Sequence, residues 1–190
     1  MSIVLVGSTS GSCTLQEQAV AGTTVLTLPT TSGTILTTAS SGQSIPKAAL
    51  PAGSVLQVVN ANYAISTFSS SITYADTGLS ATITPTSATS KILVCVQQNG
   101  IGKVTSANAY VGVQLQRNST PLALIVNTAG YNNTTSPNYV GGISLEYLDS
   151  PATTSAVTYK TQFRSTGNVA TAYVQIDNEM STITLMEIAA

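Results

Sequence analysis

The sequence predicts an all-β protein, with an extended N-terminal β-strand segment followed by an antiparallel β-sandwich of jelly-roll type. Thr, Val and Ile, whose branched side chains favour strands, recur along all 190 residues. Apolar and polar residues alternate with a period of two in many segments, and no apolar stripe of helical spacing extends over about eleven residues. Turn residues separate these segments at intervals of about ten residues, which is typical of sandwiches and barrels.

Residues 1–45 are mostly small and hydroxylated, with short apolar runs between Gly and Pro residues. The runs 24–28 and 34–37 resemble each other and are predicted to form two short strands joined by a turn. This segment holds too few large apolar side chains to build a core of its own. We therefore expect three parts: an attachment segment that pairs by strands (1–38), a linker (39–52) and a β-sandwich head (53–190). The expected attachment residues are Ile3, Val4, Leu5, Val6, Leu15, Val25, Leu26 and Leu28.

The head is expected to contain longer strands. In segment 157–164 the side chains of Lys160, Gln162 and Arg164 share one face, and the apolar residues up to Phe163 share the other. The other predicted strands are 55–59, 71–77, 81–84, 91–97, 111–116, 122–126, 143–148, 172–177 and 182–188. Predicted turns lie at 76–78, 85–87, 117–119, 149–151 and 165–168.

The scarcity of ionisable side chains argues against an enzyme. The chain has no His, and only 7% of its residues are charged, whereas about a quarter is typical. A Ser-His-Asp triad is therefore excluded, and no cofactor is expected. Six scattered basic residues and a net charge of −1 argue against nucleic-acid binding. No apolar run approaches the ~20 residues of a membrane span, and no secretory signal is evident, so we expect synthesis in a cytoplasm and no membrane insertion.

Few acidic residues lie close enough to one another in the sequence to suggest a catalytic pair or a metal site. A glycan-cleaving protein would need two carboxylates about 5–9.5 Å apart. Glu146 and Asp149 are close in sequence, but we expect Glu146 on the solvent face of a strand and Asp149 in a turn. The segment 177–179 (Asp-Asn-Glu) is interpreted as a turn, with a calcium site as the alternative.

The two cysteines are far apart in sequence. Cys95 lies in an apolar run and is interpreted as a small buried hydrophobic residue, with a Cys13–Cys95 disulfide as the alternative. Two cysteines without histidine do not make a zinc site within one chain.

One uncharged loop, residues 130–139, combines aromatic rings with amide groups. Such rings and amides suit carbohydrate recognition and adaptable binding loops. The alternative is a long solvated connection, which has a similar composition. Segment 97–103 is a weaker candidate of the same kind. The expected receptor-binding residues are Tyr131, Asn132, Asn133, Asn138 and Tyr139.

Several segments resemble bacteriophage tail-fibre proteins. Residues 22–36 (GTTVLTLP, then GTIL) resemble the N-terminal repeat of many of these fibres. Residues 76–94 (DTGLSATITP, then ATSKILV), 149–164 (DSP, then TYKTQFR) and 181–188 (STITLMEI) resemble their C-terminal domain. The resemblance extends over nearly the whole chain, but it concerns scaffold motifs, and the chain has no long shaft.

The resemblance implies a short homotrimeric fibre of the virion. Its N-terminal segment would bind other tail or baseplate proteins, and its head would bind a host surface glycan or protein. The alternatives are a capsid decoration or head-fibre protein of the same virus and, from another class, a hydrolytic tailspike.

Overall fold

The computed structural model describes residues 2–6, 12–16, 50–167 and 170–190. The chain divides into two compact units, Met1–Ser44 and Ile45–Ala190, and the division falls within the segment predicted as a linker. In the first unit, β1 (Ser2–Val6) pairs antiparallel with β2 (Ser12–Gln16), with Ile3 opposite Leu15. The strands predicted at 24–28 and 34–37, and with them Val25, Leu26 and Leu28, lie outside the described residues.

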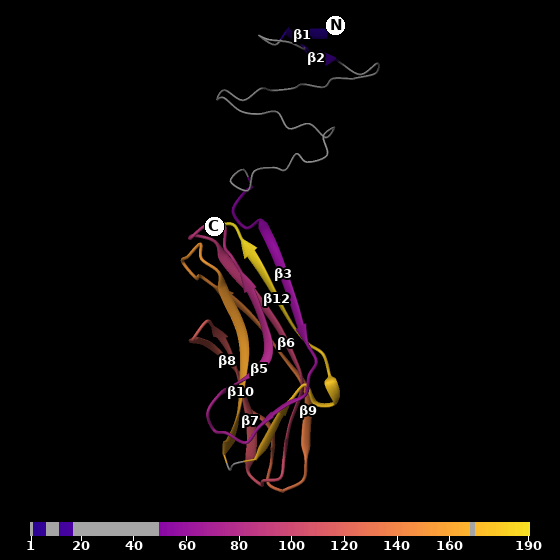
Figure 1. Cartoon of the computed structure of the whole chain (residues 1–190), viewed down its shortest axis with the longest axis vertical. Coiled ribbons are helices and arrows are strands. Elements are labelled where there is room, and N and C mark those ends of the chain that lie inside the picture. The colour runs from indigo at the N-terminus through magenta and orange to yellow at the C-terminus, as the bar shows by residue number, and fades with distance from the viewer. Residues whose placement is uncertain (1, 7–11, 17–49, 168–169) are drawn as a thin grey trace. The chain divides into compact units, whose positions relative to one another are not determined.

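The second unit is all-β, with a single short turn of 3-10 helix, η2 (Ile176–Asn178), among its described residues (Figure 1). Its strands are β3 (Val55–Tyr63), β4 (Thr67–Ser69), β5 (Ala75–Ile83), β6 (Lys91–Val104), β7 (Ala109–Arg117), β8 (Thr120–Asn132), β9 (Asn138–Asp149), β10 (Val157–Gly167), β11 (Thr171–Val174) and β12 (Ser181–Ile188).

These strands form two antiparallel sheets. The four-stranded sheet has the order β5-β10-β7-β8. In the six-stranded sheet β6 is central, with β12 and then β3 on one edge and β9 on the other. The short strand β11 continues the β12 edge of β6, and β4 pairs with β11. The predicted antiparallel sandwich is thus present as two antiparallel sheets.

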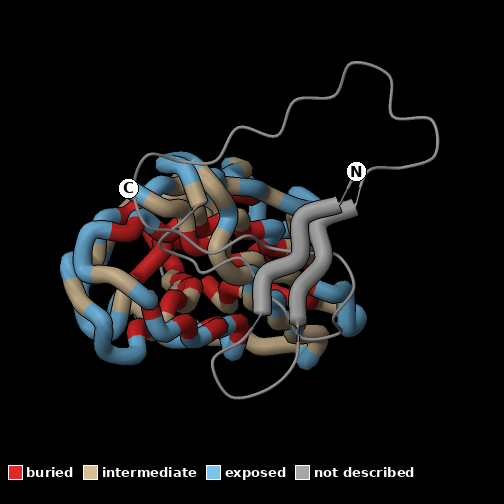
Figure 2. The backbone as a smooth tube through the Cα atoms, turned by 90° about the horizontal axis from the view of Figure 1, so that it is seen from above, coloured by how far each residue is buried: buried red, intermediate tan, exposed pale blue. Residues whose placement is uncertain are grey.

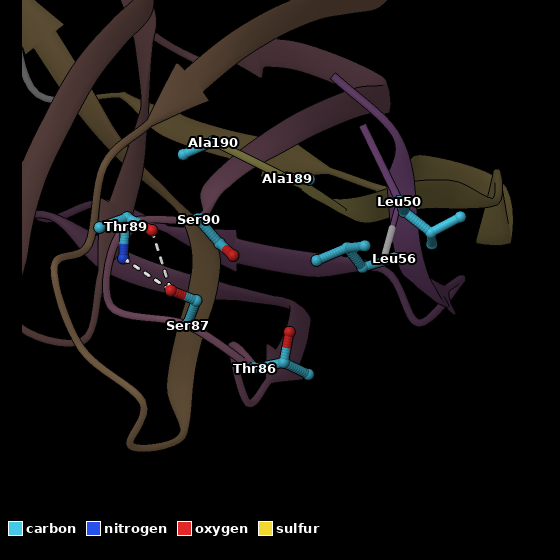
Figure 3. A pocket seen from close by; sticks show the side chains of 8 residues that line it. All are labelled: Leu50, Leu56, Thr86, Ser87, Thr89, Ser90, Ala189 and Ala190. Carbon is cyan, nitrogen blue, oxygen red and sulfur yellow. Dashed lines mark hydrogen bonds between the residues drawn. The ribbon is translucent and has the colours of Figure 1, made fainter. Parts of the chain in front are cut away.

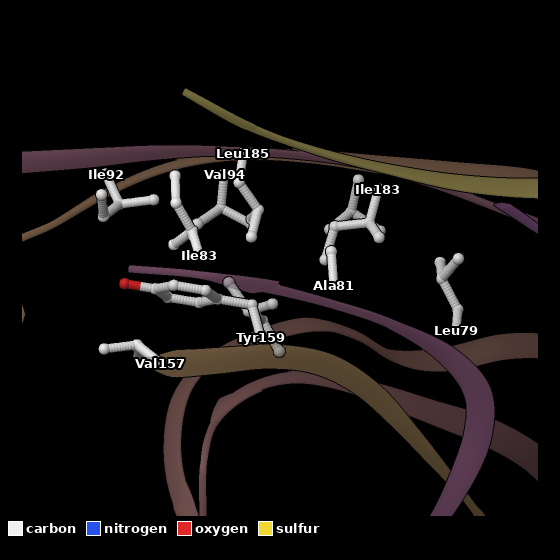
Figure 4. Close-up of a cluster of buried hydrophobic side chains, with 11 residues drawn as sticks. Leu79, Ala81, Ile83, Ile92, Val94, Val157, Tyr159, Ile183 and Leu185 are labelled. Atoms are coloured by element: carbon white, nitrogen blue, oxygen red, sulfur yellow. The ribbon is translucent and has the colours of Figure 1, made fainter. Parts of the chain in front are cut away.

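Buried side chains fill the space between the sheets. Figure 4 shows Ile83 of β5 and Tyr159 of β10 facing Val94 of β6 and Leu185 of β12, and all four are at most 2% exposed. In Figure 2 the buried backbone lies inside the unit and the exposed backbone surrounds it. A second cluster includes Phe163, also fully buried. The alternation predicted for 157–164 is therefore confirmed.

The start and the end of this unit lie together. The amide of Gly53 donates to the Ala189 carbonyl oxygen at 2.8 Å, and the amide of Ala189 donates to the Ser54 carbonyl oxygen at 2.9 Å. The connection between β8 and β9 is at the opposite end of the strands, lowest in Figure 1. The unit therefore has its termini at one end and the β8–β9 loop at the other.

The turn predicted at 76–78 is wrong, because these residues lie inside β5. Gly78 adopts φ +92°, and its missing side chain leaves room for the ring of Tyr63, which a Cβ would overlap. A register shift lies in the facing strand between Lys160 and Gln162. The glycine marks an irregularity within a strand and not a chain reversal. The strand predicted at 71–77 is correspondingly absent from 71–74.

Two further predictions need correction. Cys95 is a free thiol that is only partly buried, because the inward positions of β6 are Ile92, Val94 and Val96 and the thiol faces outward. Asp149 is the last residue of β9, and it is buried instead of lying in a solvated turn.

None of the described residues belongs to a helix that is long and apolar enough to cross a membrane.

Candidate functional site

The segment predicted as a loop, residues 130–139 (the candidate loop), is mostly strand: Tyr131 and Asn132 end β8, Asn138 and Tyr139 begin β9, and of the predicted receptor-binding residues only Asn133 lies in the connection between the two strands. Because β8 belongs to the four-stranded sheet and β9 to the six-stranded sheet, the loop bridges the two sheets at one end of the sandwich. Gly130 (φ +70°) allows close approach of the strands, since a Cβ there would lie 3.0 Å from the Asn138 carbonyl oxygen.

A buried lysine holds this loop in place. Lys103 of β6 is fully buried, and its Nζ donates to the carbonyl oxygens of Ser106 at 2.7 Å and Thr134 at 2.8 Å. Charge-assisted hydrogen bonds of this length are strong, and a buried charge without them would be costly. Through these two hydrogen bonds, Lys103 links the β8–β9 loop to the connection between β6 and β7.

The two predicted aromatic residues are exposed but contact different sheets. Tyr131 is 53% exposed, packs on Tyr110 of β7 with ring centroids 6.0 Å apart, and donates a hydrogen bond from its hydroxyl to Asn108 Oδ1 at 3.0 Å. Tyr139 is 52% exposed and covers Gly102 of β6. The loop thus presents one ring over each sheet and not a single aromatic platform.

The three predicted asparagines differ in their surroundings. The amide group of Asn132 donates to the Ser136 carbonyl oxygen at 3.1 Å, and that of Asn138 donates to the Tyr131 carbonyl oxygen at 3.2 Å. Both amides therefore shape the loop itself. Asn133 is exposed at the tip. An external ligand would meet mainly the two rings and the tip.

The weaker candidate, segment 97–103, is the second half of β6 and not a loop. Gln98 is fully buried, where its Oε1 accepts from Thr161 Oγ1 at 2.7 Å and its Nε2 donates to Ser181 Oγ at 3.0 Å. Its polar groups are satisfied inside the sandwich, so this residue stabilises the fold.

The neighbouring acidic residues Glu146 and Asp149 have different surroundings. Glu146 is exposed on β9, as predicted, whereas Asp149 forms an ion pair with Arg117 and accepts a hydrogen bond from the Tyr159 hydroxyl at 2.7 Å. Burial and the neighbouring Asp149 carboxylate raise the pKa of Tyr159. Residues 177–179 follow the left-handed Gln175 in a tight turn, and no group of three His, Cys, Asp or Glu side chains gathers among the described residues.

A pocket of about 420 Å³ lies beside the C-terminus. Figure 3 shows its lining of small hydroxyl and apolar side chains, in which the Ser87 hydroxyl bonds to both the backbone amide and the hydroxyl of Thr89. None of the described side chains that line it is ionisable. Its described side chains offer hydroxyl groups as hydrogen-bond donors and acceptors.

Sequence reasoning missed an apolar row on the outer face of the six-stranded sheet. Strand register places four apolar side chains side by side across four strands: Val58, Met186, Leu93 and Leu148. Val58 is 57% and Leu148 is 52% exposed. The alternation in each strand puts these apolar side chains on the outer face, but only the register between strands shows that the four lie side by side.

No protein-family model matches the chain, and no curated protein matches it in sequence.

Proposed function

We propose that this chain is a non-enzymatic bacteriophage structural protein, a short homotrimeric tail fibre. Residues 1–38 attach it to the tail or baseplate, and the β-sandwich head recognises the host surface. The observation that carries this proposal is the apolar row across the outer face of the six-stranded sheet, together with the resemblance described above.

The order of the eight long strands supports a jelly roll as the finer description of the head. One sheet has the order β3-β12-β6-β9 and the other β5-β10-β7-β8. Strands that follow one another in the chain, such as β5 and β6, mostly lie in opposite sheets, and the last long strand lies beside the first. This is the arrangement that two Greek keys produce in a double-sheet jelly roll.

A second copy of the chain is the occupant that best suits the apolar row. Val58 and Leu148 are exposed at the two ends of the row, and Met186 and Leu93 lie between them. Lys91 of β6 lies on one side of the row and Glu146 of β9 on the other. A neighbouring copy could therefore bury the row and pair Lys91 with Glu146 of its partner. The number three comes from the resemblance to tail fibres.

The N-terminal unit supports attachment by strand pairing. Its described part is a single antiparallel pair, β1 and β2, and an isolated pair of strands is marginal in water. Such a pair gains stability by adding its backbone hydrogen bonds to a partner's sheet. Deletion of residues 1–30 is expected to abolish incorporation into virions. Incorporation of the truncated chain would contradict the attachment role.

Assembly is tested by sedimentation velocity of the purified chain. We expect a trimer, and we expect Leu148→Asp to shift it toward monomer because a carboxylate would be desolvated in the buried row. The matched control is Leu124→Asp, since Leu124 is 55% exposed on β8 of the other sheet. A monomeric wild type, or equal dissociation in both variants, would overturn the assembly proposal.

Location and chemistry are tested separately. Labelled protein on virions should be imaged at the tail, and an even distribution over the capsid would instead favour a decoration protein. Incubation with host polysaccharide should leave the glycan chains at full length. Shortened chains would contradict the non-enzymatic assignment.

A further inference from the structure

The outer face of the four-stranded sheet contains a shallow hollow of about 260 Å³ near the candidate loop. Its lining includes Ile72, Tyr110, Asn127, Arg164 and Thr166. Strands β7, β8 and β10 supply four of these side chains, so the hollow has a rigid floor.

The cation in this hollow, Arg164, has no carboxylate partner among the residues that the structure describes. Arg117 and Lys160 form ion pairs with carboxylates, and Lys103 is bound to carbonyl oxygens. Arg164 forms no such pair with a described residue; its Nε is buried without an acceptor, and its guanidinium lies over the Tyr74 ring, 4.6 Å from the centroid. A guanidinium held over an aromatic ring keeps the planar fork of N–H donors that matches a carboxylate.

An unsatisfied acceptor lies close to this cation. Gly112 of β7 separates Arg164 from Asn127, since a Cβ there would lie 3.5 Å from Arg164 Nε and 3.1 Å from Asn127 Oδ1. Asn127 Oδ1 is buried and has no donor among the described residues. The hollow thus offers a cationic donor and a neutral acceptor side by side. A ligand that carries both a carboxylate and a hydroxyl group would suit both.

An aromatic wall completes the hollow and joins it to the candidate loop. Tyr110 lines the hollow, and Tyr131 of the loop packs on Tyr110 with ring centroids 6.0 Å apart. Such rings present an apolar face with a polar tip, which suits the mixed apolar and hydroxylated faces of a sugar ring. A volume of about 260 Å³ is below the usual range of about 300–1,000 Å³ for drug-sized ligands, and it fits one sugar unit.

We propose that this hollow binds a carboxylate-bearing sugar, such as a uronic acid unit of an acidic surface glycan. Arg164 pairs with the carboxylate, Asn127 accepts a hydrogen bond from a sugar hydroxyl, and Tyr110 contacts the ring. The proposal rests on the proposed host-surface recognition and names its ligand class.

Saturation-transfer NMR on the purified full chain tests this proposal, with methyl glucuronide as the probe and methyl glucoside as its neutral counterpart. We expect saturable binding of the glucuronide, and binding of the glucoside that is weaker by about tenfold or more. Arg164→Gln should reduce glucuronide affinity by about tenfold or more, and Arg164→Lys should reduce it less because the charge remains. The matched control, Lys160→Gln, removes the same charge from the same face outside the hollow and should change affinity by less than about twofold.

Thermal unfolding and sedimentation of each variant establish that it folds and assembles as the wild type does. Equal binding of both glycosides, or equal losses in Arg164→Gln and Lys160→Gln, would overturn the proposal. Acetate or a glutamyl dipeptide that binds as tightly as the glucuronide would overturn the sugar assignment. These outcomes are distinct from failure of the proposed function, which would appear as a monomeric protein or its absence from virion tails while glucuronide binding persisted.

Discussion

Arg117 and Asp149 join the two sheets of the sandwich: Nη1 of Arg117 in β7 lies 2.9 Å from Oδ1 and 2.7 Å from Oδ2 of Asp149 in β9. The Tyr159 hydroxyl donates to the same carboxylate from β10 at 2.7 Å. The Asp149 side chain is only 7% exposed and that of Arg117 is 25% exposed. A buried carboxylate with two partners of this kind fixes how one sheet lies on the other.

Removal of this carboxylate is expected to destabilise the head strongly. Asp149→Ala leaves a partly buried guanidinium and a buried hydroxyl without their acceptor, which costs about 3–5 kcal/mol. The matched control is Asp76→Ala, whose exposed pair with Lys160 is worth at most about 1 kcal/mol. Chemical denaturation of both variants measures the difference, and equal losses would contradict the role assigned to Asp149.

The buried Glu187 predicts a loss of stability in acid. Burial would raise the pKa of Glu187, but hydrogen bonds from Thr86 and Gln57 outweigh it and hold this pKa below its ordinary value of 4.5. A lowered folded pKa gives stability that is present above pH 4.5 and is lost as the pH falls through the folded value.

We expect Glu187→Gln to lower the free energy of unfolding at neutral pH, and this deficit to shrink between about pH 6 and about pH 3. Glu146→Gln, the same substitution at an exposed position of β9, is the control. Denaturation midpoints at the two pH values provide the measurement, and a constant deficit would refute the prediction.

Gly78 is expected to resist substitution more than another glycine with the same backbone geometry. Gly78→Ala brings a Cβ against the Tyr63 ring at φ +92°, whereas Gly53→Ala meets nothing within 4 Å at φ +86°. We expect a loss of about 1 kcal/mol at Gly53 and about 2–4 kcal/mol at Gly78. Similar losses at both sites would show that the Tyr63 ring can move away from the new Cβ without a loss of stability.

Lys103 is expected to control the order of the candidate loop. Lys103→Met removes the donor that holds the Thr134 carbonyl oxygen, so amides of the tip around Asn133 should exchange faster with solvent. Stability should fall by about 1–3 kcal/mol. Lys91→Met, at an exposed position of β6, is the control. Unchanged exchange at the tip would contradict the fastening role.

The exposed rings of the loop are expected to contribute to adsorption. Tyr131→Ala with Tyr139→Ala should reduce virion adsorption by about tenfold, and the unfolding temperature should change by less than about 4 °C because both rings are half exposed. Phe68→Ala removes another exposed ring, on β4, and should leave adsorption unchanged. Unaltered adsorption in the double variant would place recognition elsewhere.

Alternation along single strands was enough to predict the class and the core. The inward faces of β7 and β10, with Val113 and Phe163 fully buried, follow directly from the period of two. The alternation within a strand does not tell which residues of neighbouring strands lie opposite each other. Only the pairing of Leu93 with Met186 and Leu148 reveals the apolar row.

Contacts between residues that are far apart in the chain could not be predicted from the sequence either. Asp149 is 32 residues from Arg117, so a turn was the simpler interpretation of Asp149. Gly78 was interpreted as a turn residue because glycine serves turns and bulges alike. Similarly, the hollow at Arg164 depends on Tyr74 and Gly112, which meet it only across strands.

The hydrogen bonds that join Gly53 and Ser54 to Ala189 affect how the head would resist a pulling force. If the chain acts as the proposed fibre, anchored before residue 50 and bound to a receptor at the β8–β9 loop, the force on it acts along the direction of its strands. The load then reaches β3 and β12 in shear, so that the backbone bonds from Val55 to Tyr63 bear it together instead of opening one after another. Such a head would resist detachment forces well, even though β3 is an edge strand.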